Sequence, residues 1–138
     1  MKLEEVRGYT VRSVLARLFQ GLAWLILAGL VAQFYLAGAA LFGATTFRPH
    51  RTLGSVLVVA ALLLLVLALV ARPSRRVVGL TAGLVGLIIV EVLLPSLRIG
   101  WPWVAAFHIV VAVAIAAQAA AIACILSRAP AGVRLLDV

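Results

Sequence analysis

Two histidines are the residues of this sequence best suited to chemistry. His50 stands in the stretch FRPHR, where a polar segment meets a long apolar run, and His108 lies several residues inside another apolar run. A neutral imidazole is the commonest metal ligand in proteins, and two imidazoles can hold the iron of a b-type heme. Each histidine also has an ordinary interpretation, His50 as a polar helix start near lipid headgroups and His108 as a hydrogen-bonded residue inside a bundle.

The composition places both histidines in an integral membrane protein. Of the 138 residues, 66% are hydrophobic and 12% are charged, and the mean hydropathy is +1.25. A soluble domain carries about 25% charged residues, roughly twice this share. The length fits one domain. The single cysteine, Cys124, excludes an internal disulfide and any Cys-x-x-Cys site for zinc or thiol–disulfide exchange.

Four apolar segments are each long enough to cross a bilayer as a helix, which takes about 20 residues. Because lipid offers the backbone no hydrogen-bond partners, each segment must be helical. The links between them are short, so consecutive helices run antiparallel, and we expect an all-α, up-down-up-down four-helix bundle. The sequence shows no evident internal repeat. The expected spans are residues 18–41, 52–71, 77–95 and 101–127.

The basic residues predict the side of the membrane on which each end lies. Nine of them flank one side of the expected bundle and three the other, so the positive-inside rule places both termini in the cytoplasm. Residues 1–17 then form a cytoplasmic or interfacial segment, with an amphipathic helix over 3–17, and residues 128–138 form a cytoplasmic tail. The nine are Lys2, Arg7, Arg12, Arg17, Arg72, Arg75, Arg76, Arg128 and Arg134.

The charge pattern also bears on partners and on the source membrane. The net charge is +8, but the positive residues flank apolar segments and do not line one face, so we expect no nucleic-acid binding. Eleven of the twelve basic residues are arginine. That preference is typical of a GC-rich bacterial genome and favours the bacterial inner membrane, with the lipid bilayer as the chain's surroundings.

The basic residues also serve as marks of depth. His50 and His108 are 22 and 20 residues from the arginines at the inner ends of their helices. At about 1.5 Å per residue, both imidazoles lie roughly 30–33 Å from the inner boundary, near the outer surface. The same measure puts Gln33 and Glu91 roughly 22–24 Å from that boundary, one layer below the histidines.

The matched height makes the two histidines candidate axial ligands of a heme b held between helices. Gly54 lies one turn after His50 on the same helical face and would leave room for the flat macrocycle. Three arginines of the outer side could pair with the two heme propionates. They are Arg48, Arg51 and Arg98.

Glu91 and Gln33 form a second candidate site. A carboxyl group inside a membrane must be protonated or paired. Glu91 is therefore either part of a proton relay beneath the heme or a neutral side chain hydrogen-bonded to Gln33 or to a backbone carbonyl. Gln118 is expected to form an interhelical hydrogen bond, and Cys124 to be a small packing residue.

Two short segments carry a resemblance to known proteins. PHRTLG, at residues 49–54, and FHIVVAVAIA, at residues 107–116, resemble a bacterial group of small, uncharacterised four-helix membrane proteins. More distantly, the chain is similar over about residues 15–127 to one four-helix half of heme A synthase.

The second resemblance implies a heme-b-type scaffold. In that family each half carries a His-Arg near the start of its second helix and a His near the start of its fourth. Those positions fall here on His50, Arg51 and His108. Phe47 stands where that family has its catalytic glutamate, so the resemblance does not extend to heme A synthesis.

Three functions compete. The first is a b-type cytochrome module, monomeric or homodimeric, that handles heme or passes electrons between a quinone and a redox protein. The second is a non-catalytic scaffold or accessory subunit without a cofactor. The third is a small transporter with Glu91 and Gln33 in a polar cavity, which unbroken helices and the lack of an evident repeat disfavour. No nucleophile–base pair, phosphate-binding loop or carboxylate cluster identifies an enzyme.

Overall fold

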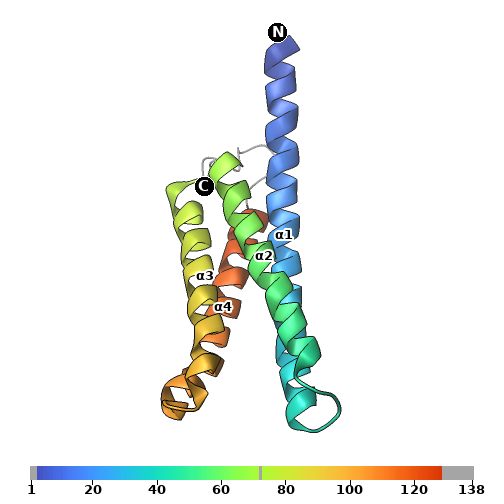
Figure 1. The fold of residues 1–138 in the computed structure, drawn as a ribbon. Coiled ribbons are helices and arrows are strands. Elements are labelled where there is room, and N and C mark those ends of the chain that lie inside the picture. The colour runs from blue at the N-terminus through green and yellow to red at the C-terminus, as the bar shows by residue number, and fades with distance from the viewer. Residues whose placement is uncertain (1–2, 72, 129–138) are drawn as a thin grey trace.

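The structure, a computed structural model, describes residues 3–71 and 73–128, and the side chains of residues 14–71 and 73–128. Within these ranges it consists of four long α-helices and one short 3₁₀ helix (Figure 1). The elements are α1 (Leu3–Leu41), α2 (Arg48–Ala71), α3 (Arg75–Leu93), η1 (Leu94–Arg98) and α4 (Pro102–Arg128). The predicted all-helical fold is confirmed.

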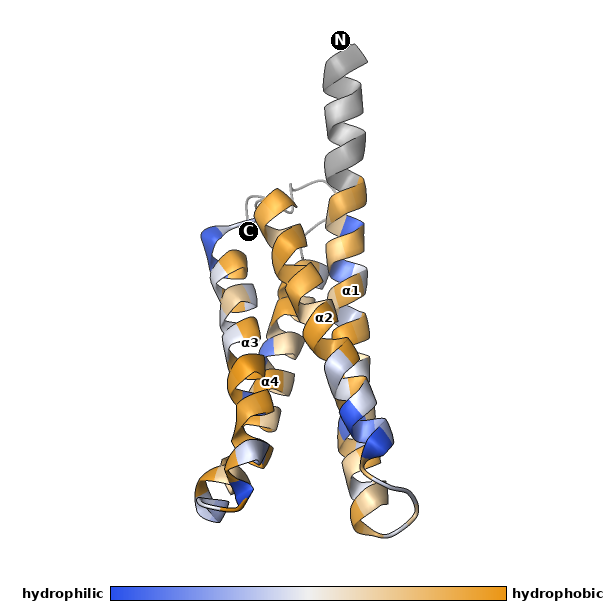
Figure 2. Ribbon diagram, viewed as in Figure 1, coloured by the Kyte–Doolittle hydropathy of each residue, from blue (hydrophilic) through white to orange (hydrophobic). Residues whose placement is uncertain are grey.

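The four long helices make the chain a multi-pass membrane protein by length and composition. Each lies in a stretch that is long and apolar enough to cross a membrane, except that the α1 stretch begins at Val14, and the α3 stretch continues through η1. The four stretches are close to the spans predicted from the sequence. The stretches are Val14–Leu41, Arg48–Ala71, Arg75–Arg98 and Pro102–Ser127. Hydrophobic residues dominate the middle of α2 and α3, and hydrophilic residues gather near the start of α2 (Figure 2).

The first helix is longer than predicted. It runs without a break from Leu3 to Leu41, so residues 3–17 begin the same helix and do not form a separate amphipathic one. No proline interrupts this stretch of sequence, and the helix therefore has no local reason to end near residue 17. Residues 1–2, 72 and 129–138 lie outside the described part of the chain, and most of the predicted cytoplasmic tail lies with them.

Local signals end and begin the helices at the two loops. The segment after α1 turns at Gly43, whose φ of 75° is a left-handed conformation that glycine adopts without steric cost. The Thr46 hydroxyl then accepts a hydrogen bond from the backbone N–H of Arg48 at 3.3 Å, at the start of α2. Ser74 caps α3, where its hydroxyl accepts from the N–H of Val77 at 3.4 Å.

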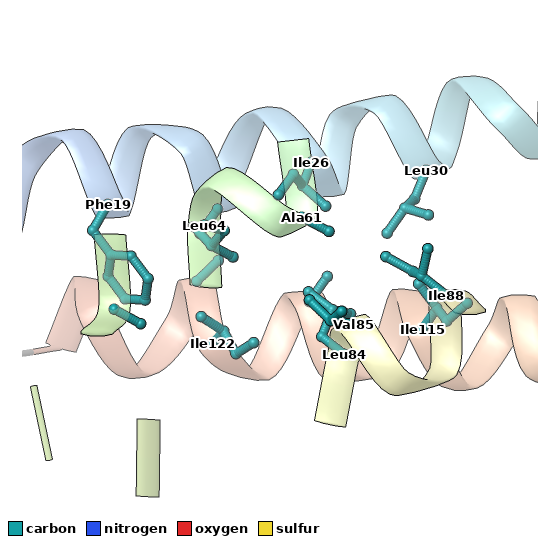
Figure 3. Packing of buried hydrophobic residues seen from close by; sticks show 14 of the residues in the cluster. Phe19, Ile26, Leu30, Ala61, Leu64, Leu84, Val85, Ile88, Ile115 and Ile122 are labelled. Carbon is teal, nitrogen blue, oxygen red and sulfur yellow. The ribbon is translucent and has the colours of Figure 1, made fainter. Parts of the chain in front are cut away.

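The helices pack as the four corners of a square. α1 packs against α2 and α4, and α3 also packs against α2 and α4, so α2 and α4 occupy diagonal corners. Helices α1 and α2 form one hairpin, and α3 and α4 form the other. The two hairpins diverge toward the end that carries the 42–47 loop and η1 (Figure 1). The residues of the hydrophobic core lie in the other half of the bundle. Figure 3 shows how their side chains pack between the helices.

The buried core repeats along the chain, although no repeat is evident in the sequence. Eight buried residues of the first hairpin match eight of the second at a constant separation of 58 positions. The pairs are Phe19 and Val77, Ala23 and Thr81, Ile26 and Leu84, Leu30 and Ile88, Leu57 and Ile115, Ala61 and Ala119, Leu64 and Ile122, and Ala68 and Leu126. The expectation of no internal repeat is therefore wrong at the level of packing.

The core positions of the two hairpins match, and so do the contacts between their helices. Both observations indicate that an approximate two-fold axis along the bundle relates one hairpin to the other. This axis exchanges α1 with α3 and α2 with α4. Equivalent core positions are filled by side chains of different type and size, such as Phe19 and Val77, so the burial pattern repeats while the residue types do not.

Candidate functional site

His50 occupies the first turn of α2. Pro49, which precedes it, suits this turn because the N–H that proline lacks would have no partner inside the helix. The half-buried imidazole of His50 lies across from α1, and its Nδ1 is 3.2 Å from the backbone carbonyl oxygen of Gln33. Phe47 packs edge-on against the same imidazole, with the ring centroids 6.2 Å apart.

His108 has the corresponding environment in the second hairpin. Its Nδ1 is 3.1 Å from the backbone carbonyl oxygen of Glu91, on α3. The same nitrogen is also 3.1 Å from the Oε1 atom of the Glu91 side chain. The Glu91 side chain is 16% exposed and that of His108 is 31% exposed, so this pair is well shielded but open on one side.

The two histidines meet between the hairpins. Their ring centroids are 6.3 Å apart, and the ring planes cross at 71°. Because α2 and α4 are at diagonal corners, both side chains must reach toward the bundle axis to come this close. The prediction that His50 and His108 lie at one height is therefore confirmed.

The contacts of Nδ1 favour one tautomer of each imidazole. A backbone carbonyl oxygen can only accept a hydrogen bond, so the contacts of His50 and His108 fit Nδ1 as the donor. In a neutral imidazole this leaves Nε2 with the free lone pair. Metal-binding histidines share this pattern, since they commonly donate the other ring N–H to a carbonyl or a carboxylate.

The spacing also suits a shared metal ion. Two imidazoles that bind opposite sides of one ion at about 2.0–2.1 Å have ring centroids about 6 Å apart. The observed 6.3 Å between the rings of His50 and His108 matches that value. Within the described residues there is no cluster of three or more His, Cys, Asp or Glu that could hold a metal ion. The described residues therefore offer such an ion two imidazole ligands.

Gln33 and Glu91 lie beside the histidines. The prediction that these two residues form a separate layer below the histidines is wrong. Each backbone carbonyl is in hydrogen-bond contact with its histidine. The depth estimate assumed that the inner arginines of all four helices lie at one level, and it counted backbone positions only. It therefore contains neither the register between the two helices of a hairpin nor the direction in which each imidazole points.

Two buried oxygens of this site have no hydrogen-bond partner within the described part of the chain. They are Oε1 of Gln33 and Oε2 of Glu91. Buried polar atoms are normally hydrogen-bonded, and unpaired ones in a native protein tend to mark a bound water, an ion or a functional group. Both unpaired atoms belong to the side chains next to the histidine pair.

Gly54 serves the site in a different way from that expected. A Cβ atom added at Gly54 would lie 2.9 Å from Nε2 of Gln33. The glycine therefore makes room for the Gln33 amide, and the space above it is not an open approach for a macrocycle.

The predicted propionate partners are all on the molecular surface. Arg48, Arg51 and Arg98 are exposed, the first two at the start of α2 and the third at the end of η1. An open hollow beside the start of α2 includes one of these arginines and neither histidine. It is lined by Thr46, Arg48, Pro49, Thr52, Leu53 and Val56.

Polar contacts away from the histidines hold neighbouring helices together. Gln118 on α4 donates from Nε2 to the backbone carbonyl of Leu80 on α3 at 2.6 Å, which confirms the predicted interhelical hydrogen bond. The Ser127 hydroxyl accepts from both Gln20 and Trp24 of α1, a contact that the sequence did not reveal. Cys124 is exposed on its helix, so its expected packing role inside the bundle is wrong.

Fold and site together define a small four-helix membrane protein with a histidine pair between two similar hairpins. Residues 33–99 of the chain match a family of unknown function, DUF6220. The matched segment is slightly less than half of the chain and includes Gln33, His50 and Glu91, while His108 lies beyond it. No curated protein and no solved structure matches the chain, so the resemblance to heme A synthase finds no support in these comparisons.

Proposed function

We propose that this chain is a membrane-bound, b-type heme-binding module with His50 and His108 as the axial ligands. The observation that carries the proposal is that each imidazole has Nδ1 tied to a carbonyl oxygen while the rings lie 6.3 Å apart. That arrangement leaves one Nε2 lone pair from each hairpin to bind iron, at a spacing suited to one ion.

A bound heme b would supply a one-electron redox centre. The chain's own contribution would be to hold the iron through two imidazoles and to fix their orientation through Gln33 and Glu91. The exposed arginines of the same end of the bundle, Arg48, Arg51 and Arg98, would pair with the propionates. The sequence offers no second redox motif, so electron transfer would need a quinone or a redox protein as partner, with heme handling as the other role.

The location is part of the same proposal. The distribution of basic residues supports an orientation with the histidine end of the bundle at the outer face and both chain termini in the cytoplasm. The preference for arginine supports a bacterial inner membrane as the location. A homodimer is compatible with this arrangement, because the helices expose large apolar side chains over much of their length.

A second function is favoured by the position of the core. The buried residues of α2 begin at Leu57 and those of α4 at Ile115, so the core lies on the inner side of both histidines. Because this core does not include the histidine pair, the bundle can fold without a cofactor. That independence supports a scaffold or accessory subunit that packs against a larger membrane complex.

A visible spectrum separates the two functions. The chain would be expressed in a heme-supplied host and purified in mild detergent, and a dithionite-reduced minus oxidised spectrum would be recorded. We expect a Soret band and a sharp α-band that are lost in His50→Ala and in His108→Ala. Gln118→Ala removes a polar side chain from the same helix as His108 and should keep both bands. A colourless protein with full helical circular dichroism would overturn the heme proposal and leave the scaffold function.

A further inference from the structure

The repeat that organises the core extends to the histidine site. His50 and His108 are separated by the same 58 positions as the paired core residues, and so are Gln33 and Glu91. In each hairpin the histidine lies 17 residues after the residue whose carbonyl oxygen binds its Nδ1. The site therefore consists of two copies of one unit, and each unit pairs an acceptor on the first helix with an imidazole on the second.

The two copies differ in one chemical respect. Glu91 offers His108 a second acceptor, because its Oε1 is 3.1 Å from the same Nδ1 that binds the carbonyl. Gln33 gives His50 only its backbone carbonyl, since its side-chain amide lies against Gly54. The residue that replaces Gly54 in the second hairpin, 58 positions later, is Ala112. The second hairpin therefore has a Cβ atom at the position where the first has none.

We propose that Gln33 and Glu91 are symmetry-related positioning residues that hold both histidines with the proton on Nδ1, and that Glu91 makes His108 the stronger electron donor of the two. The first part concerns the protein alone. The second part rests on the proposed heme function, because it describes how each imidazole would bind iron. A carboxylate that accepts the outer N–H of a ligating imidazole raises the basicity of that ligand, whereas a carbonyl does so less.

The first part is tested in heme-free protein by nitrogen NMR of ¹⁵N-labelled histidine in detergent. We expect both imidazoles to be protonated at Nδ1, with Nε2 unprotonated. Glu91→Gln keeps the size of the side chain and the backbone carbonyl that accepts from His108, but it removes the carboxylate. The ¹⁵N signals of His108 should therefore move, while those of His50 remain unchanged. Two histidines protonated at Nε2, or equal shifts of both signals in Glu91→Gln, would overturn the assignment.

The second part is tested by the midpoint potential of heme-loaded protein at one pH. A stronger donor stabilises ferric over ferrous iron. Loss of the carboxylate in Glu91→Gln should reduce the preference for ferric over ferrous iron by about tenfold. For one electron, this change corresponds to a rise of the midpoint potential by about 59 mV. Gln33→Glu combined with Gly54→Ala, which fills the space that the side chain at position 33 otherwise takes, should lower the potential. The exchanged variant, which adds Glu91→Gln to these two substitutions, should return close to the wild-type value, because the carboxylate has moved to the equivalent position.

The exchanged variant distinguishes a specific effect of the carboxylate from misfolding, because a damaged site would not regain the midpoint potential of the wild type. A heme-loaded protein whose potential is the same in wild type and Glu91→Gln overturns the second part. A wild type that binds no heme overturns the proposed function and the second part together. The NMR result then still decides whether Gln33 and Glu91 position the histidines.

Discussion

The imidazoles of His50 and His108 face each other between two helical hairpins, with ring centroids 6.3 Å apart and planes that cross at 71°. One ring comes from α2 and the other from α4, which are at diagonal corners of the bundle. Neither hairpin contains the pair by itself. The site therefore exists only while the two hairpins are docked, and a ligand that binds both rings must stabilise the docked state.

This dependence predicts a ligand-linked gain in stability. A ligand that binds only the folded state at 100 times its dissociation constant adds about 2.7 kcal/mol to the free energy of unfolding. We expect a gain of this size for the wild type on loading with heme, measured by circular dichroism during titration with a denaturing detergent. His108→Ala should lose the gain and Gln118→Ala should keep it. An equal gain in His108→Ala would show that heme binds elsewhere.

The internal repeat predicts that paired core substitutions have similar effects. Leu64 and Ile122 are 1% and 0% exposed and occupy equivalent positions in α2 and α4. Substitution of either by alanine leaves a cavity, and we expect each to lower the free energy of unfolding by about 1–3 kcal/mol. The values lie toward the low end for core truncations, because lipid is as apolar as the protein interior and the transfer contribution is small.

The matched control for this pair is Leu63→Ala, on the exposed face of α2 at 54% exposure. It should change the free energy of unfolding by less than about 0.5 kcal/mol. A large loss in Leu64→Ala without one in Ile122→Ala would contradict the equivalence of the two hairpins.

The hydrogen bond of Gln118 predicts an energetic coupling between α3 and α4. A Cβ atom added at Gly83 would lie 2.8 Å from Nε2 of Gln118, which donates to Leu80. Gly83→Ala should therefore displace the amide and destabilise the protein by about 1 kcal/mol, and Gln118→Ala by about 0.6 kcal/mol. In the double variant the alanine at position 83 meets no amide, so the two losses should not add.

The control substitution for this cycle lies one turn away on the same helix. A Cβ atom at Gly86 would meet nothing within 4 Å, so Gly86→Ala should be neutral or stabilising, because alanine favours the helix over glycine. Unfolding titrations of the wild type, Gly83→Ala, Gln118→Ala and the double variant measure the coupling directly. Strictly additive losses would show that the Gln118 amide moves aside without cost.

The sequence alone was sufficient to predict the four helices and the common height of His50 and His108. Both follow from one-dimensional quantities, the length of apolar runs and the rise per helical residue. The level of Glu91 was not predictable in the same way. It depends on the register of α3 against α4 and on the direction of the His108 side chain, which packing determines and which no residue count contains.

The repeat and the function of Gly54 escaped sequence analysis for a different reason. A core position is defined by burial, so Phe19 and Val77 can occupy equivalent positions without a repeated residue type. Gly54 was correctly assigned to the face of His50, but only the structure shows that the Gln33 amide lies against it. The signal that could have revealed the repeat is the spacing of the polar pairs, since 17 residues separate Gln33 from His50 and Glu91 from His108.

The distribution of basic residues predicts the orientation of the chain, which cysteine labelling can determine. Cys124 would first be replaced by alanine. Single cysteines would then be placed at Thr45, in the loop after α1, and at Ser127, near the other end of α4, both of which are exposed. In intact cells a membrane-impermeant maleimide should label the cysteine at position 45 and not that at 127. Permeabilised cells should show labelling at both. The reverse pattern would contradict the positive-inside assignment and would place the histidine pair at the cytoplasmic face, and labelling of both in intact cells would contradict four membrane spans.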